Sequence, residues 1–280
     1  MPSSLTINGL TRVIAHIGFP TQTFKSPMIY NPYFADAGIN AVVVPFSCEA
    51  HNYPAFLKAV FGNTNTAGAL ITMPHKVATV GLIDRVAPAA EIAGSCNAVR
   101  LGADGRLEGD MFDGEGFVRG IRRKGFAPQG KSALILGCGG VGSAIAASLA
   151  AAGAARLALF DARAESAAAL AGRLNKHYPA LAVETGGNDV RGFDLVVNAT
   201  PLGMYDGDPL PADVSRLSPE TFVGEVVLRE ATPFVRAAQQ RGCTVQLGTD
   251  MLFEQIPAYL EYFGLPSTTP ENLRRLAQLD

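Results

Sequence analysis

Short apolar runs alternate along this chain with segments of helical composition, and the runs have the length of buried strands. In the N-terminal part, strands are expected at residues 12–17, 40–44 and 69–73, with helices at residues 26–37 and around residues 56–61. This order of strand, helix, strand, helix and strand predicts a parallel sheet covered by helices.

Local signals mark the ends of these elements. Ser26 before Pro27 predicts a helix start, with the Ser26 hydroxyl as N-cap and the proline at the first helical position. Pro45 and Pro74 are expected to end the second and third strands.

The next segment is expected to be helical at residues 84–92 and then to form a hairpin. The hairpin strands, residues 96–101 and 106–109, flank a turn signal at residues 103–105. A helix follows, with Asp113 at its N-cap position, and we place the first domain crossing there.

The C-terminal half alternates between strands and helices again, which predicts a doubly wound parallel sheet. Strands are expected at residues 133–136, 156–161, 181–184, 194–199, 221–227 and 244–247, and helices at residues 164–176, 233–241, 249–263 and after Pro270. The last helices either close this domain or cross back to the first, and we assign them to the first.

The strongest single motif lies where the first of these strands runs into an alanine-rich helix. Glycines 137, 139 and 142 form a G-x-G-x-x-G pattern, with Gly140 inside it, between strand and helix, the setting that a dinucleotide fingerprint requires. Gly137 permits the tight turn, Gly139 lets the backbone approach a pyrophosphate, and Gly142 allows close helix–strand packing. The helix amides around Gly140 and Val141 would face the phosphates.

The fold class that follows is α/β with two domains. Residues 1–112 plus 249–280 are expected to form an α/β substrate-binding domain. Residues 113–248 are expected to form a Rossmann dinucleotide-binding domain.

The second strand of the Rossmann domain ends in Asp161, about the ~20 residues beyond the glycines that the fingerprint expects. A carboxylate there accepts hydrogen bonds from the ribose hydroxyls and repels a 2′-phosphate, so NAD is expected rather than NADP. Arg163 leaves the alternative open, because an arginine just past the strand could pair with that phosphate.

Composition and charge narrow the class of protein. The chain has 280 residues, 48% of them hydrophobic and 17% charged, as in globular proteins. A net charge of −2 without a basic block argues against nucleic acid as the main partner. No signal peptide or membrane span is recognised, so we expect a cytoplasmic protein. The four cysteines and four histidines lack metal spacing, so reduced thiols and no metal are expected.

Candidate catalytic groups stand at strand ends outside the glycine motif. Lys76 follows Pro74 after the third strand, Asn97 begins the hairpin, and Asp113 lies at the domain crossing. Each alone also has a structural explanation, as a solvated lysine or a helix cap. Together, beside a cofactor, they are candidates for the reaction.

Seven motifs in order, spanning nearly the whole chain, resemble those of the shikimate dehydrogenase family, which includes quinate/shikimate dehydrogenases. They are FKSP (24–27), ITMPHK (71–76), AGSCNAV (93–99), GDMFDGEGF (109–117), GCGGVGSA (137–144), NATPLGM (198–204) and GTDMLFEQ (248–255).

The resemblance implies reversible oxidation of a ring secondary alcohol to a ketone, with Lys76 and Asp113 as the catalytic pair. A lysine amine can accept or relay the hydroxyl proton. Whether Lys76 is the base or an electrostatic partner stays open. By the same resemblance, Ser26, Thr72, Asn97 and Gln255 bind substrate, and Asn198, Thr200, Pro201 and Gly248 lie beside the nicotinamide.

Three positions depart from the family pattern, in which two serines and a tyrosine hold the substrate carboxylate and of which only the second serine, Ser26, is kept here. Phe24 replaces a serine, Leu70 replaces an asparagine and Leu228 stands where a tyrosine is common. Each lost hydrogen bond to a charged group costs about 1.5–3 kcal/mol. Shikimate is therefore expected to be a poor substrate, unless Lys25 or Arg229 supplies a new carboxylate partner.

Two other classes remain as alternatives. One is a non-catalytic ligand-binding or regulatory protein on the same scaffold, and the other is a Rossmann oxidoreductase acting on a linear substrate. The physiological substrate, the direction of flux and the oligomeric state stay open, with a homodimer compatible with the sequence.

Overall fold

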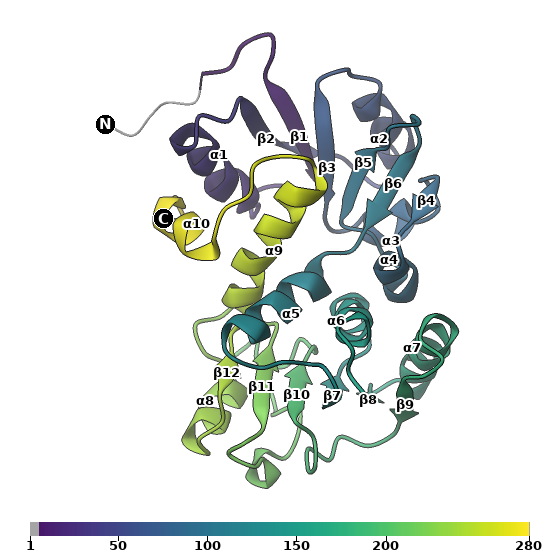
Figure 1. Ribbon diagram of the computed structural model, residues 1–280, viewed down its shortest axis with the longest axis vertical. Coiled ribbons are helices and arrows are strands. Elements are labelled where there is room, and N and C mark those ends of the chain that lie inside the picture. The colour runs from purple at the N-terminus through teal and green to yellow at the C-terminus, as the bar shows by residue number, and fades with distance from the viewer. Residues whose placement is uncertain (1–5, 280) are drawn as a thin grey trace. The chain divides into compact units, whose positions relative to one another are not determined.

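The computed structural model describes residues 6–279, in two compact units (Figure 1). Of the described residues, the first unit comprises 6–90, 95–111 and 256–279, and the second comprises 91–94 and 112–255. The second crossing falls inside helix α9 (Gly248–Tyr262), after Gln255.

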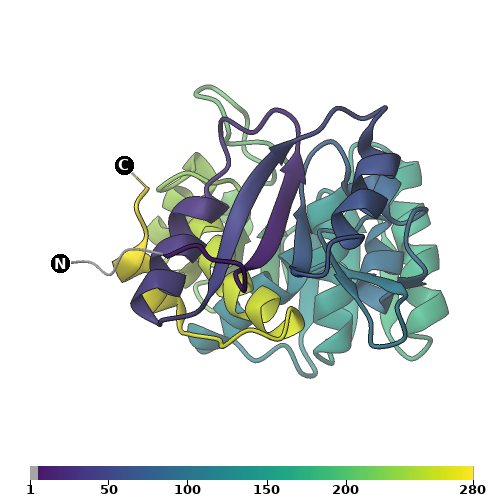
Figure 2. The same ribbon diagram turned by 90° about the horizontal axis from the view of Figure 1, so that it is seen from above.

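The first unit contains a six-stranded sheet with the strand order β2-β1-β3-β5-β6-β4. Its strands are β1 (Arg12–Gly18), β2 (Ala41–Ser47), β3 (Thr66–Ile71), β4 (Arg85–Val86), β5 (Ala98–Leu101) and β6 (Leu107–Asp110). Its helices are α1 (Ser26–Asp36), α2 (Tyr53–Phe61), α3 (Lys76–Thr79), α4 (Pro88–Ala93, which crosses the boundary), the end of α9, and α10 (Pro270–Leu276). The purple to blue strands are followed most easily in Figure 2.

The predicted parallel βαβαβ part is present, because β1 pairs in parallel with both β2 and β3. The hairpin of β5 and β6 adds antiparallel pairs and makes the sheet mixed. Gly105, in the hairpin turn, has a positive φ of 79°, which glycine adopts without steric cost.

The second strand does not end at Pro45 as predicted. β2 continues to Ser47, and Pro45 lies opposite His16 of β1. β2 is an edge strand with a neighbouring strand on one side only. Proline has no backbone N–H, and it is tolerated in an edge strand because no strand on the open side needs that donor.

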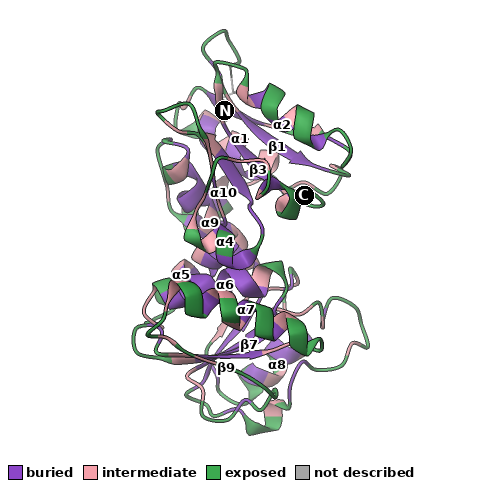
Figure 3. Ribbon diagram, turned by 90° about the vertical axis from the view of Figure 1, so that its right-hand side faces the viewer, coloured by how far each residue is buried: buried purple, intermediate pink, exposed green. Residues whose placement is uncertain are grey.

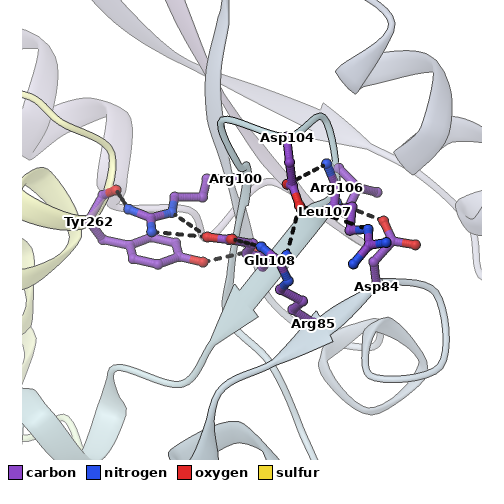
Figure 4. A network of polar contacts seen from close by, with 8 residues as sticks. All are labelled: Asp84, Arg85, Arg100, Asp104, Arg106, Leu107, Glu108 and Tyr262. Carbon is purple, nitrogen blue, oxygen red and sulfur yellow. Dashed lines mark hydrogen bonds and ion pairs between the residues drawn. The ribbon is translucent and has the colours of Figure 1, made fainter.

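The C-terminal part of α9 is fastened to the hairpin by a polar network (Figure 4). Arg100 donates to both the Glu108 carboxylate and the Tyr262 carbonyl, and the Tyr262 hydroxyl donates to the Glu108 carbonyl. The Arg100 guanidinium also lies 4.4 Å from the centre of the Tyr262 ring. Arg85 completes the network by pairing with Glu108 and Asp104.

The second unit contains a six-stranded parallel sheet with the order β12-β11-β10-β7-β8-β9. Its strands are β7 (Ser132–Leu136), β8 (Arg156–Phe160), β9 (Ala182–Thr185), β10 (Leu195–Asn198), β11 (Phe222–Glu225) and β12 (Val245–Gln246). Its helices are α5 (Asp113–Arg123), α6 (Gly140–Ala151), α7 (Ala164–His177), α8 (Pro233–Gln240) and the start of α9, with a 3₁₀ turn at Val214–Arg216.

The strand order confirms the predicted doubly wound sheet. β7 lies between β8 and β10, so the strands that follow β7 are added first on one side of it (β8, β9) and then on the other (β10, β11, β12). Ligands of such sheets bind at this switch point, beyond the carboxyl ends of the strands. Helix α6 is almost wholly buried against its neighbours, whereas α7 keeps an exposed side (Figure 3).

Three local predictions are wrong. Ser26 and Asp113 are the first helical residues of α1 and α5, so the N-cap positions belong to Lys25 and Phe112. The predicted helix over residues 84–92 begins instead with the two-residue strand β4, because Arg85 and Val86 pair with β6. Sequence alone does not reveal this pairing, since the partner strand lies more than twenty residues later.

Candidate active site

The glycine turn after β7 has the backbone geometry that its sequence predicted. Gly137 has a φ of +96°, and a Cβ there would lie 2.8 Å from the carbonyl carbon of Ala199 at the end of β10. A Cβ on Gly142 would lie 1.9 Å from the Gly137 carbonyl oxygen. Side chains at these two positions would push strand and helix apart.

Gly139 and Gly140 are exposed at the start of α6. A Cβ on Gly139 would meet no protein atom within 4 Å, so the space beside it is open. The first amides of the twelve-residue α6 begin at this turn, where helices bind anions. Open space and helix amides together fit the pyrophosphate of a dinucleotide.

Asp161, just beyond β8, is bonded to this turn. One carboxylate oxygen accepts a hydrogen bond from the Cys138 amide at 2.8 Å, and the other accepts one from the Arg163 amide at 2.9 Å. The Arg163 guanidinium lies 3.9 Å from the carboxylate, and its side chain is 73% exposed. Each carboxylate oxygen keeps a further lone pair for a ribose hydroxyl.

The loop after β10 is held by a buried carboxylate that the sequence analysis did not identify. Glu225, at the end of β11, accepts hydrogen bonds from the Asn198 amide at 3.0 Å and from the Thr232 hydroxyl at 2.7 Å. It also accepts from the amides of Val226 and Val227. Burial raises the pKa of the Glu225 carboxyl, although these hydrogen bonds oppose the shift.

Asn198 is fully buried, and its side-chain oxygen accepts a hydrogen bond from the Thr200 hydroxyl at 2.6 Å. Its side-chain amide donates hydrogen bonds to the Glu225 carboxylate and to the Leu202 carbonyl. Asn198 therefore shapes the turn that carries Thr200 and the exposed Pro201. Gly248 is also enclosed, since a Cβ there would lie 2.4 Å from the Val227 carbonyl oxygen.

In the first unit, backbone hydrogen bonds bring together three predicted site segments. The Ile71 amide, just before Thr72, donates to the Asn97 carbonyl at 2.8 Å. The Cys96 amide donates to the Lys76 carbonyl at 2.9 Å. Thr72, Lys76 and Asn97 are therefore anchored around the end of β3.

A histidine that the sequence analysis left without a role joins this group. His16 of β1 stacks on Phe24, with 4.0 Å between ring centroids. Burial, assisted by the Lys76 charge, lowers the pKa of His16 to about 4. The signal was a polar residue at the centre of an otherwise apolar strand.

Gly18 lies two residues after His16 and so on the same face of β1. A Cβ on Gly18 would lie 2.7 Å from the Phe24 ring and 2.5 Å from the Thr72 methyl carbon. The face of β1 that carries His16 thus also contacts Phe24 and Thr72. Leu70 is buried in β3, opposite His16, and Ser26 begins α1.

The remaining predicted residues belong to the second unit. Asp113 is buried at the start of α5, and Leu228 is 60% exposed after β11. Gln255 packs against Gly116 of α5, and its buried side-chain oxygen has no hydrogen-bond partner among residues 6–279. Arg229 donates to the Gly203 and Met204 carbonyls and pairs with Asp206.

The four cysteines are free and buried. Across the described chain, no group of three or more histidine, cysteine, aspartate or glutamate side chains is arranged to hold a metal ion. Helices of the length and apolarity needed to cross a membrane are also absent from residues 6–279.

The doubly wound sheet, the glycine turn and the bonded aspartate define a dinucleotide-binding α/β protein. Residues 16–99 match the family described as the shikimate dehydrogenase substrate binding domain. The chain is 36% identical to shikimate dehydrogenase (NADP(+)) of Rubrobacter xylanophilus over 258 residues, 89% of each sequence. It is also 36% identical to the enzyme of that name from Moorella thermoacetica, covering 90% of this chain and 87% of the relative. The protein belongs to the shikimate dehydrogenase family.

Solved structures agree with this assignment. Shikimate 5-dehydrogenase of Listeria monocytogenes, in complex with shikimate and NAD, matches with a TM-score of 0.89 and 25% identity, over 96% of this chain and 97% of that one. The 5-ketofructose reductase of a Gluconobacter strain matches at 0.86 and 26% identity, over 95% and 97%. Quinate dehydrogenase of Corynebacterium glutamicum, in complex with NAD, matches at 0.85 and 28%, over 95% and 98%.

Proposed function

We propose that the protein is an NAD(P)-dependent dehydrogenase that reversibly oxidises a ring secondary alcohol to a ketone. Shikimate, quinate and related cyclic polyols are the candidate substrates. The observation that carries this proposal is the anchoring of Thr72, Lys76 and Asn97 around the end of β3, in a family whose relatives are named shikimate dehydrogenases.

The first unit is assigned the substrate and the second unit the dinucleotide. The match of residues 16–99 to the family's substrate binding domain supports the first assignment. The open glycine turn at the start of α6 supports the second. A dinucleotide bound there would supply the acceptor for the hydride of the carbinol carbon.

Lys76 and Asp113 are proposed as the catalytic pair. As the hydride leaves, the alcohol loses its proton, which the Lys76 amine accepts or relays, and the reverse reaction returns it. Asp113 orients the ammonium and accepts a hydrogen bond from a substrate hydroxyl. Thr72, Asn97 and Gln255 bind further hydroxyl groups, and the Gln255 oxygen, which has no partner among the described residues, is suited to that role. Ser26 is the position kept for a substrate carboxylate.

We propose NAD as the preferred cofactor, although the two relatives from Rubrobacter and Moorella are named for NADP(+). The support comes from this chain's own residues. Asp161 is held against the glycine turn, and its charge would repel a 2′-phosphate there. The exposed Arg163 is the residue that could reverse this preference.

Shikimate itself is proposed to be a poor substrate. Phe24 and Leu228 stand where the family pattern has a serine and a tyrosine that hold the carboxylate, and neither offers it a hydrogen bond, so Ser26 alone is kept. The buried Leu70 adds a further apolar side chain. Arg229 already pairs with Asp206 and donates to two carbonyls. Of the two residues that could form a new bond to the substrate carboxylate, this leaves the exposed Lys25, which directly follows Phe24.

Reduction of NAD and NADP, followed at 340 nm with a panel of cyclic polyols, tests the proposal. Turnover of at least one ring alcohol, abolished by Lys76→Ala, is expected. Binding of cofactor and polyol without turnover would favour a non-catalytic regulatory protein. Turnover of linear polyols alone would favour a Rossmann oxidoreductase that acts on a linear substrate.

A further inference from the structure

His16 is a buried polar side chain whose ring nitrogen Nδ1 has no hydrogen-bond partner among residues 6–279. The residue is only 8% exposed. A buried polar atom without a hydrogen-bond partner lowers the stability of the folded protein. Such an atom in a native structure therefore suggests a functional role, such as binding a ligand.

The surroundings of His16 are those of the proposed substrate site. Its ring stacks on Phe24, and the same face of β1 contacts Thr72 through Gly18. Lys76 is close enough for its charge to act on the imidazole. All of these residues belong to the first unit, so the grouping does not depend on the second.

The charge state of the ring limits what it can recognise. With a pKa lowered to about 4 by burial and by Lys76, His16 is neutral at physiological pH. A neutral imidazole has one donor and one acceptor nitrogen, and a hydroxyl group can satisfy either. It supplies no positive charge to compensate a buried carboxylate. The Phe24 ring beside it supplies none either, so among His16, Phe24 and Lys76 only Lys76, the proposed catalytic residue, contributes a positive charge.

We propose that His16 is a specificity-determining residue whose Nδ1 hydrogen-bonds an uncharged oxygen of the substrate, so that the site takes a neutral cyclic polyol rather than a ring carboxylate. This inference rests on the proposed dehydrogenase function and adds the substrate class and the residue that selects it. The Gluconobacter neighbour is named for a substrate, 5-ketofructose, that also carries no carboxylate.

The test compares shikimate with its hydroxymethyl analogue, in which the carboxylate is reduced to an alcohol. For the wild type we expect kcat/KM to be roughly tenfold or more higher for the analogue, the ratio that one good hydrogen bond supplies. His16→Val, which keeps an apolar strand residue, should raise KM for the analogue about tenfold while changing kcat little. His16→Asn, whose amide reaches the place of Nδ1, should restore most of the loss. His51→Val, at an exposed histidine, is the matched control.

The outcomes separate the inference from the proposed function. If shikimate is the better substrate and His16→Val leaves both KM values unchanged, the inference is wrong while the dehydrogenase function stands. Loss of shikimate turnover in Lys25→Ala would then identify Lys25 as the carboxylate partner. If neither compound is oxidised, the proposed function fails. Calorimetric binding of the two compounds to wild type and His16→Val then decides the inference, since equal affinities in both proteins would overturn it.

Discussion

The carboxylate of Asp161 accepts a hydrogen bond of 2.8 Å from the backbone amide of Cys138. The end of β8 is thereby bonded to the glycine turn that follows β7. The group proposed to select the cofactor is thus held in place by the turn proposed to bind the phosphates.

Replacement of Asp161 should change the choice between NAD and NADP. We expect the wild type to favour NAD by roughly tenfold or more in kcat/KM, and Asp161→Asn to narrow that ratio because the amide does not repel a phosphate. Arg163→Ala should lower NADP use and leave NAD use nearly unchanged. Steady-state kinetics with both cofactors check this, and a wild-type preference for NADP would contradict it.

Lys76→Ala should lower kcat by about 10²–10⁴ if the lysine transfers the alcohol proton. Lys58→Ala, at an exposed position of α2, is the control and should retain wild-type kcat. Rates measured at saturating cofactor and substrate test the role, and a near-normal kcat for Lys76→Ala would remove the residue from the mechanism.

Two glycines of the same turn should respond differently to alanine. Gly142→Ala should lower the melting temperature, because its Cβ would lie 1.9 Å from the Gly137 carbonyl oxygen. Gly139 has a backbone conformation open to any residue, with no protein atom within 4 Å of a Cβ. Gly139→Ala should keep the melting temperature yet weaken cofactor binding roughly tenfold, by blocking the pyrophosphate. Calorimetry and cofactor titration read the two effects separately, and equal cofactor affinity in Gly139→Ala would argue against phosphate binding there.

Glu225→Gln should lower the free energy of unfolding by about 1–3 kcal/mol. The carboxylate accepts from both Asn198 and Thr232, and an amide would turn a donor toward these donors. Glu165→Gln, on the exposed side of α7, should change stability by less than about 0.5 kcal/mol. Urea unfolding of both variants provides the comparison, and equal midpoints would show that the buried network is dispensable.

His16 should make the protein sensitive to mild acid. Its folded pKa of about 4 lies below the unfolded value of 6.5, so protons bind the unfolded chain more tightly. The stability contributed by neutral His16 is complete above pH 6.5 and is lost as the pH falls towards 4, by about 3 kcal/mol in total. The difference in unfolding free energy between wild type and His16→Val should therefore change over this interval. A constant difference would mean that the imidazole titrates normally.

Sequence patterns predicted most of the framework, because strand and helix periodicity and the glycine turn are local properties. β8 has the predicted start, and β7 and α7 differ from the prediction by one residue at one end. The extension of β2 past Pro45 was missed because it depends on the strand's place at a sheet edge. The pairing of β4 with β6 was missed because it is non-local.

The residues of the proposed site were also predicted only in part. Motif resemblance supplied Lys76, Thr72 and Asn97, but Glu225 and His16 became visible only through burial and side-chain contacts. Glu225 lies outside the seven motifs, and the roles of Asn198 and Thr232 follow from it. His16 is a single polar residue in β1 whose importance depends on Phe24 and Lys76, which come from other segments.

The bonds between Arg100, Glu108 and Tyr262 also bear on the order in which the chain folds. During synthesis, residues 112–255 of the second unit leave the ribosome before the end of α9 and can form their sheet at once. The first unit begins earlier but lacks residues 256–279 until they too have been synthesised, and its hairpin network includes Tyr262. Because the second unit is inserted within the first, the hairpin network of the first unit can close only after the second unit has been synthesised.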